Sequence, residues 1–305
     1  MLKRKIDVVF NRFLTDPRKS ALLITGSRQV GKTFSIRQFG QKHFKSFVEI
    51  NFIKDKEARA VFENAVDEKD VLLRLSAVVD GRLIPGETLI FLDEVQKCPE
   101  AVTYIKFLVD EGSYRYVLSG SLLGVELKNV RSVPVGYMSE AEMYPLDFEE
   151  FLEANGVSSE IVAHLRQCFV ERKSPDKVVH DRIMRYLRLY FVVGGMPAAV
   201  QRYVDTNDLK SVMDEQAKII VEYKRDVTQY DEQLKMKLRR IYSLVPSELN
   251  KQNKRFYLKT VTARGCLDRV EDDFVWLKEA GVAIPAFNVD EPKVPLELAT
   301  KANLF

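Results

Sequence analysis

The first half of the chain alternates between short apolar runs and longer segments with helical periodicity. Apolar runs predict strands at 21–25 and 88–93, and alternation with period two predicts one at 46–51. Residues 114–119 supply another strand, and 138–144 is the candidate for a fifth. The run 88–93 is apolar until its final Asp93, as expected for a strand that is buried on both faces. Helical spacing follows Gly31 and recurs at 55–64, 70–79 and 101–110. This alternation predicts an α/β fold in which helices cover a parallel sheet.

From about residue 145 onward the strand-like runs largely disappear. Helical spacing predicts helices at 148–154, 159–170, 180–191, 196–203 and 209–223. Beyond Leu234 the pattern indicates two or three further helices and then an apolar run at 282–289, which is the length of a short hairpin or wing. The chain therefore changes from an α/β half to a mainly helical half.

Composition narrows the class of protein. The chain has 46% hydrophobic and 30% charged residues, which is typical of a globular protein, and its net charge of +3 gives no general affinity for nucleic acid. Its three cysteines are far apart, so neither a disulfide framework nor a paired metal site is expected. No run reaches the roughly 18 apolar residues of a membrane span, and no signal-peptide core follows the basic start. We expect a cytoplasmic protein without a membrane partner.

The strongest local motif is the segment Gly-Ser-Arg-Gln-Val-Gly-Lys-Thr, which directly follows the first predicted strand. Such a loop curls so that successive backbone N–H groups surround phosphate, and the helix that follows adds its positive end. Lys32 is expected to reach the β- and γ-phosphates and to assist catalysis, and the Thr33 hydroxyl to ligate Mg²⁺. The alternative is a glycine turn that only caps a helix. The residues expected to bind ATP are Gly26, Ser27, Arg28, Gln29, Val30, Gly31, Lys32, Thr33 and Phe34.

Two carboxylates end the third predicted strand. Asp93 is expected to be a second anchor for Mg²⁺, and Glu94 to orient and deprotonate the water that attacks the γ-phosphate. The alternative is a solvated turn. An acidic residue directly after the metal carboxylate favours hydrolysis over phosphoryl transfer to a metabolite, so we expect an ATPase.

A serine pair follows the fourth predicted strand. Either Ser119 or Ser121 could contact the γ-phosphate or the attacking water, and both are predicted catalytic residues. The alternative is that one of them caps a helix beginning near Leu122.

Several blocks in this order resemble a group of prokaryotic AAA+ superfamily ATPases that carry a C-terminal domain similar to restriction endonucleases. These blocks are Gly26-Ser-Arg-Gln-Val-Gly-Lys-Thr33, Ile90-Phe-Leu-Asp-Glu-Val-Gln-Lys-Cys-Pro99, Leu118-Ser-Gly-Ser-Leu-Leu-Gly124, Met143-Tyr-Pro-Leu-Asp-Phe-Glu-Glu-Phe-Leu152 and Val193-Gly-Gly-Met-Pro197.

The resemblance implies a five-stranded sheet in the order 5-1-4-3-2. It also implies an AAA+ nucleotide-binding domain at 1–155, a helical lid at 156–233 and a winged-helix-like domain at 234–305. The roles of Lys32, Thr33, Asp93 and Glu94 carry over to matching positions.

The chain departs from the group at two places. Many relatives have Gly-Arg where this chain has Gly136-Tyr137, so a trans-acting arginine finger is missing there. Arg131 is a substitute candidate, and a solvated arginine is the alternative. Residues 301–305 resemble the junction where the endonuclease-like domain begins, so that domain is expected to be absent.

A basic stretch at 235–264 makes DNA a candidate partner, and an internal spacer with solvated charges is the alternative. Its basic residues are Lys235, Lys237, Arg239, Arg240, Lys251, Lys254, Arg255, Lys259 and Arg264. The leading hypothesis is an ATPase that uses Mg²⁺ and ATP to drive a conformational change on DNA or a protein partner, with ADP as product and a homo-oligomer as a candidate assembly. A nucleotide-binding switch or scaffold with little intrinsic hydrolysis is the second hypothesis, and a small-metabolite kinase is the third.

Overall fold

A computed structural model describes residues 2–79, 83–120, 136–226 and 232–250, together with the single residues 252, 289 and 294. The chain divides into two units, Met1–Glu215 and Gln216–Phe305, which are described separately. Nearly all of the predicted elements that can be compared with the structure lie in the first unit.

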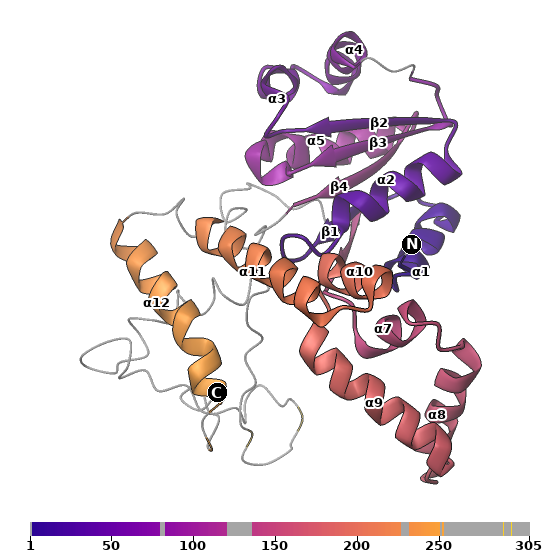
Figure 1. Ribbon diagram of the computed structural model, residues 1–305. Helices are drawn as coiled ribbons and strands as arrows, with labels where there is room; N and C mark the ends of the chain where they lie inside the picture. The colour runs from indigo at the N-terminus through magenta and orange to yellow at the C-terminus, as the bar shows by residue number, and fades with distance from the viewer. Residues whose placement is uncertain are drawn as a thin grey trace. The chain divides into compact units, whose positions relative to one another are not determined.

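The first unit is built on a sheet of five parallel strands (Figure 1). The strands are β1 (Ala21–Thr25), β2 (Ser46–Asn51), β3 (Thr88–Asp93), β4 (Arg115–Ser119) and β5 (Met138–Glu142). Their order is β2-β3-β4-β1-β5, which confirms the predicted 5-1-4-3-2 arrangement. Because β4 lies between β1 and β3, the loop that follows β1 and the carboxylate that ends β3 are two strands apart at one edge of the sheet.

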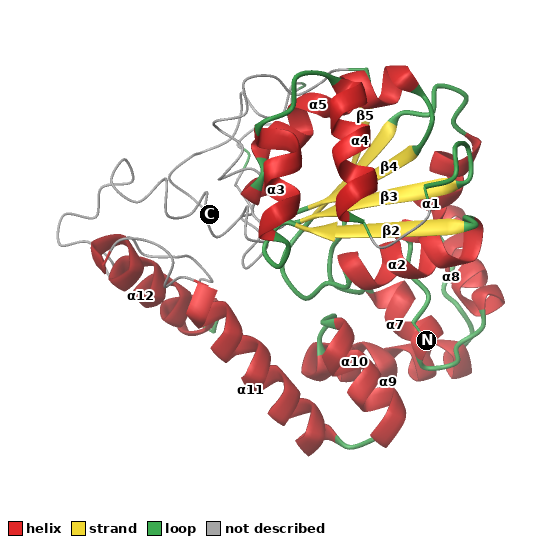
Figure 2. Cartoon of the chain, turned by 90° about the horizontal axis from the view of Figure 1, so that it is seen from above, coloured by secondary structure: helices red, strands yellow, loops and turns green. Residues whose placement is uncertain are grey.

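Helices cover both faces of this sheet (Figure 2). One face packs against α3 (Lys56–Glu63), α4 (Glu68–Val78) and α5 (Pro99–Glu111). The other face packs against α1 (Ile6–Thr15) and α2 (Lys32–His43). The strand β3 is buried along its whole length, as its continuous apolar run predicts.

The helix α1 was not predicted from the sequence. Its apolar residues Ile6, Phe10 and Phe13 follow helical spacing and are all buried. The rings of Phe10 and Phe39 stack with their centroids 4.5 Å apart, so α1 is fastened to α2.

The helices α7 (Phe148–Ala154), α8 (Ser159–Glu171), α9 (Lys177–Val193) and α10 (Pro197–Thr206) follow the sheet, and we call 148–206 the helical segment. A second core forms within it from Leu146, Phe151, Val193, Ala199, Val200 and, from the next helix, Val212. The bounds predicted for α7 agree with the structure, and α8, α9 and α10 differ from their predictions by a few residues at their ends.

Two sequence blocks that lie far apart along the chain meet at the base of the helical segment. The Leu146 N–H donates to the Gly195 carbonyl at 2.7 Å, and the Tyr190 hydroxyl donates to the Leu146 carbonyl at 2.7 Å. A Cβ atom at Gly195 would lie 2.2 Å from the Leu146 oxygen. Gly195 is therefore required by close backbone contact.

The helix α11 (Leu209–Asp226) begins in the first unit and continues into the second, where α12 (Glu232–Leu249) follows. The predicted winged-helix domain at 234–305 is described only over its first helix, α12, and at three single residues. The apolar run 282–289 except for Val289, Cys266, and the basic stretch at 251 and from 253 onward lie outside the described residues. Within the described part of the chain, no helix has both the length and the apolar character needed to cross a membrane.

The contact between Gly195 and Leu146 leads to a prediction about stability. Gly195→Ala should lower the free energy of unfolding by roughly 2 kcal/mol or more, because a methyl group must displace a backbone carbonyl. Gly156→Ala is the control, since the space around Gly156 is open and only its positive φ of 76° is strained, at a cost of about 1–2 kcal/mol. Urea unfolding of both variants measures the difference. A smaller loss for Gly195→Ala than for Gly156→Ala would contradict the packing argument.

Candidate functional site

Three polar residues end three neighbouring strands at the same edge of the sheet. Asn51 ends β2, Asp93 ends β3 and Ser119 ends β4. The parallel register pairs Asn51 with Asp93 and Asp93 with Ser119. These three polar side chains therefore form a row at the carboxyl ends of the strands, and the Asp93 carboxylate lies at the centre of the row.

The Asp93 carboxylate is 4% exposed and accepts four hydrogen bonds. Oδ2 accepts from Thr33 Oγ1 at 3.3 Å and from Asn51 Nδ2 at 2.9 Å. Oδ1 accepts from the Glu94 N–H at 3.1 Å and from the Ser119 hydroxyl. A buried carboxylate requires such partners to offset its lost hydration.

The two residues predicted to ligate Mg²⁺ are therefore in direct contact, since Thr33 donates to Asp93. A hydroxyl and a carboxylate are the oxygen ligands that Mg²⁺ accepts. No group of three or more His, Cys, Asp or Glu suited to a metal occurs among the described residues. The donor set thus fits an ion that takes most of its ligands from phosphate and water, as Mg²⁺ does.

The loop between β1 and α2 is curled by residues with positive φ. These are Gly26 at 129°, Gln29 at 63° and Gly31 at 95°. Gly26 also packs against the chain after β5, because a Cβ there would lie 2.1 Å from the Met143 carbonyl oxygen. Left-handed residues alternating with ordinary ones let successive N–H groups converge, which is the geometry of an anion nest. The N-terminus of α2 follows at once and adds its positive end.

Lys32 lies in the first turn of α2 and is largely buried. Its Nζ donates to the carbonyls of Gly26 at 2.8 Å and Ser27 at 2.7 Å, so the ammonium is held against the loop. Burial lowers the pKa of Lys32 to about 8; Glu94 and Asp93 oppose this shift and Arg28 adds to it. The Lys32 ammonium is thus removed from water and held by two backbone carbonyls of the loop, and neither of its two hydrogen bonds goes to a carboxylate.

Glu94 follows Asp93 in a left-handed conformation, with φ of 58° and ψ of 46°. Such a backbone is costly for a residue with a side chain, by roughly 1–3 kcal/mol, and it occurs often at functional sites. Gln96 Nε2 donates to Glu94 Oε2 at 2.5 Å. The Glu94 carboxylate is therefore held by Gln96 directly after the end of β3.

Sequence reasoning missed Arg4, whose side chain is 9% exposed. Its Nη1 donates to the Val30 carbonyl in the loop at 2.8 Å, and its Nη2 donates to the Tyr144 carbonyl at 2.6 Å. Its Nε donates to Glu150 Oε1 at 3.1 Å, and Glu150 belongs to the capping box that starts α7. One guanidinium therefore joins the phosphate-binding loop to the helical segment. No local pattern around Arg4 indicates this role.

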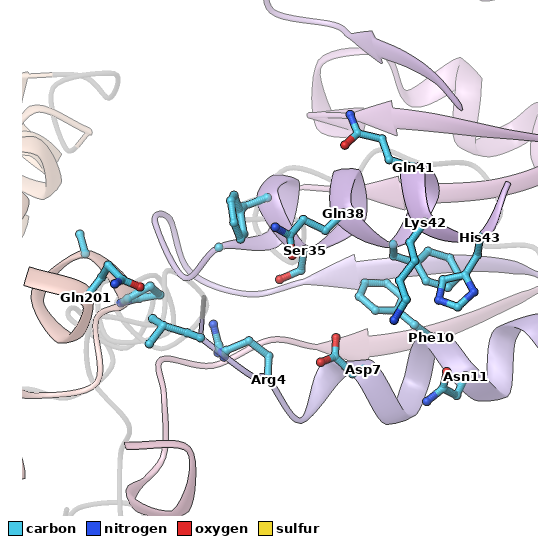
Figure 3. A pocket seen from close by; sticks show the side chains of 16 residues that line it. Arg4, Asp7, Phe10, Asn11, Ser35, Gln38, Gln41, Lys42, His43 and Gln201 are labelled. Atoms are coloured by element: carbon cyan, nitrogen blue, oxygen red, sulfur yellow. The ribbon is translucent and has the colours of Figure 1, made fainter. Parts of the chain in front are cut away.

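A cleft of about 820 Å³ opens beside the loop, between α1, α2 and the start of α10 (Figure 3). Arg4 and Gln201 lie toward one end, and His43 and Asn11 toward the other (Figure 3). Gly31, Phe34 and Pro197 also line the cleft, and the Phe34 side chain is exposed. The cleft is lined by apolar and polar side chains together, and Gly31 connects it to the phosphate-binding loop.

Of the two predicted catalytic serines, the structure describes Ser119 alone. Ser119 is fully buried and bonded to Asp93, so its hydroxyl is used within the protein. Ser121 and Arg131 lie outside the described residues, as does the helix predicted from Leu122. Lys106 Nζ lies 5.4 Å from the ring centroid of Tyr137, the residue at which the sequence departs from the resembled group. In the basic stretch, Arg239 and Arg240 are exposed on α12.

Comparison with known proteins agrees with this architecture. Residues 18–152 match a family described as an AAA domain, and residues 184–303 match a family described as a domain of unknown function, DUF8612. Together with the sheet order, the first match makes residues 18–152 an α/β P-loop NTPase domain of the AAA type. The predicted relationship to the group with an endonuclease-like domain is not confirmed by these matches.

Solved structures give distant matches, and no curated protein matches the chain. The Orc1 protein of Aeropyrum pernix in complex with DNA is 16% identical, with a TM-score of 0.36 over 98% of this chain and 88% of that one. Drosophila ORC bound to DNA is 12% identical, with a TM-score of 0.40 over 96% and 88%. Domain III of DnaA from Thermotoga maritima is 14% identical, with a TM-score of 0.38 over 70% and 92%. These values are too low to transfer a function.

The pKa of Lys32 predicts how nucleotide binding depends on pH. The free protein carries a charged Lys32 below pH 8 and a neutral one above it. A bound triphosphate raises this pKa, so binding above pH 8 requires proton uptake, and affinity should fall by up to roughly tenfold per pH unit there. Titration of a fluorescent ATP analogue from pH 7 to 9.5 measures this. Lys32→Arg stays charged and should show a flatter profile; equal profiles for both proteins would contradict the assignment.

The buried contacts of Arg4 predict its contribution to stability. Arg4→Met leaves Glu150 and two carbonyls without this donor, and it should cost about 3–5 kcal/mol of unfolding free energy. Arg37→Met is the matched control, because Arg37 also pairs with a glutamate, Glu49, but at the surface, where the loss should be at most about 1 kcal/mol. Urea unfolding compares the two variants, and equal losses would show that Arg4 does not join the loop to α7.

Proposed function

We propose that this chain binds ATP with Mg²⁺ at the carboxyl edge of the sheet and hydrolyses it to move the helical segment. The observation that carries this proposal is the bond between Thr33 and Asp93. It brings the end of the phosphate-binding loop and the end of β3 together, where a magnesium triphosphate needs a hydroxyl and a carboxylate. The AAA domain match over 18–152 supports the same class of activity.

The residues have separate roles in the proposed reaction. The loop from Gly26 to Thr33 binds the phosphates, and Lys32 neutralises charge on the β- and γ-phosphates. Thr33 and Asp93 hold the Mg²⁺, which when bound offsets phosphate charge. Glu94 accepts the proton of the water that attacks the γ-phosphorus while the bond to the β-phosphate oxygen breaks, which releases ADP. Contact of Ser119 or Ser121 with the γ-phosphate remains a prediction.

The cleft beside Gly31 accommodates the nucleoside in this proposal. Phe34 offers an exposed ring for stacking, and Pro197 and Gln201 contribute the start of α10. The bound nucleotide then touches both the sheet domain and the helical segment. In this proposal Arg4 and the Leu146–Gly195 contact transmit a nucleotide-dependent movement to the helical segment. Arg4 links that segment to the phosphate-binding loop, and Leu146–Gly195 links it to the chain that follows β5.

The wider context of the function is part of the proposal. We place the nucleotide-binding domain at 1–155, the lid at 156–233 and a winged-helix-like domain at 234–305. We also propose that the chain binds DNA through residues 235–264 and assembles into a homo-oligomer. Its proposed location is the cytoplasm. A nucleotide-binding switch with little hydrolysis is the second candidate, since Tyr137 with the neighbouring Lys106 stands where relatives have an arginine finger.

Two substitutions test the proposed reaction. Lys32→Ala should abolish ATP binding, because it removes the only loop ammonium that contacts the phosphates in this scheme. Glu94→Gln should bind ATP as tightly as the parent but release phosphate at least 100-fold more slowly, because the amide cannot accept the proton. Fluorescent-nucleotide binding and phosphate release are measured on each, with exposed Glu100→Gln as control. Parental hydrolysis by Glu94→Gln would overturn the general-base assignment.

The dependence of hydrolysis on protein concentration separates the two candidate functions. If a neighbouring subunit completes the site, the rate per chain should rise as the protein assembles, as expected for catalysis in trans. A rate that stays slow at every concentration while ATP binds tightly would favour the switch.

A further inference from the structure

Gln96 is a buried residue that the proposed reaction does not yet use. It lies two residues after Glu94, in the short 3₁₀ turn Val95–Lys97, and is 8% exposed. Its Nε2 donates to Glu94 Oε2 at 2.5 Å. The amide therefore contacts the carboxylate that is assigned to activate water.

The other end of the same amide has no partner. Among the described residues, Gln96 Oε1 is one of the few buried side-chain oxygen or nitrogen atoms without a hydrogen bond. A buried acceptor without a donor lowers stability, whereas an apolar side chain of the same length would avoid that cost. The glutamine at this position is thus poorly explained by the stability of the fold.

The turn does not need the amide to keep its shape. The Lys97 N–H donates to the Glu94 carbonyl at 2.9 Å, and the Cys98 N–H donates to the Val95 carbonyl at 3.0 Å. Val95 and Cys98 are both fully buried and anchor the turn by packing. What the amide adds to these contacts is its bond to the Glu94 side chain.

We propose that Gln96 is a positioning residue that fixes the Glu94 carboxylate for attack by water, an inference that rests on the proposed function. The left-handed backbone sets where the Glu94 side chain starts, and the bond from Gln96 Nε2 holds one of its carboxylate oxygens. The amide bond selects one orientation. In the step it serves, the water oxygen bonds to the γ-phosphorus, the bond to the β-phosphate oxygen breaks, and the water proton passes to Glu94.

This role predicts an effect on the hydrolytic step and not on binding. Gln96→Met keeps the length of the side chain and removes both the donor and the unpaired acceptor. It should lower kcat roughly tenfold, because a misplaced general base loses rate without changing phosphate contacts. KM and nucleotide Kd should be unchanged, and the melting temperature should be unchanged or higher because the orphan oxygen is gone.

Gln96→Glu supplies a second test. Two carboxylates at this separation repel each other when both are ionised, so kcat should fall at neutral pH. A role limited to packing predicts a loss of stability without a selective loss of kcat.

The experiment measures kcat, KM, Kd and melting temperature for the full chain, Gln96→Met, Gln96→Glu and Gln167→Met. Gln167 is the matched control, because its amide also donates to a glutamate, Glu171, at 2.8 Å but on the exposed face of α8. The proposal holds if only the Gln96 variants lose kcat. A parental kcat in Gln96→Met, or a lowered melting temperature with parallel changes in kcat and Kd, overturns it.

The same measurements separate this proposal from the one it rests on. If the parent does not hydrolyse ATP, or if Glu94→Gln is as active as the parent, the proposed function fails and Gln96 has no base to position. If Glu94→Gln is inactive while Gln96→Met retains the parental kcat, the proposed function stands and only the role of Gln96 is overturned.

Discussion

The buried Asp93 carboxylate is the point on which the rest of the site depends. Ionised oxygen atoms are costly to remove from water, and here four donors from α2, β2, β4 and the turn after β3 offset that cost. Satisfying the carboxylate therefore fixes the start of α2 against the ends of three strands. The phosphate-binding loop is positioned as a consequence, because Thr33 is both the end of the loop and a donor to Asp93.

A second constraint links the site to the helical segment. Arg4 contacts the loop, the Tyr144 carbonyl and Glu150, while Gly195 pairs with Leu146 just before α7. Because the buried guanidinium of Arg4 donates both to the Val30 carbonyl and to Glu150, a shift of the loop would also disturb the start of α7. This is the physical basis on which nucleotide binding at one edge of the sheet could change the position of helices that follow it.

Local sequence patterns predicted three strands with the observed bounds. Residues 21–25 and 88–93 are apolar runs that stop at a glycine or a carboxylate, and 46–51 alternates between apolar and polar positions. The order of those strands depends on distant pairing and came from family resemblance. The helix predicted at 101–110 is part of α5, but its apolar Phe107 is 46% exposed and does not join the core. Within the site, the loop and Asp93 are local motifs, whereas Arg4 is recognisable only through contacts made across the fold. Asn51 could have been found, since it ends its strand as Asp93 does.

The central claim is that loop 26–33 and Asp93 form one magnesium–triphosphate site. A crystal structure of the chain with Mg²⁺ and a non-hydrolysable ATP analogue tests it most directly. The account predicts phosphates within the curl from Gly26 to Thr33, the ion beside Thr33 Oγ1 and the Asp93 carboxylate, and the base in the cleft lined by Phe34. Phosphates bound elsewhere, or an ion remote from Asp93, would contradict it.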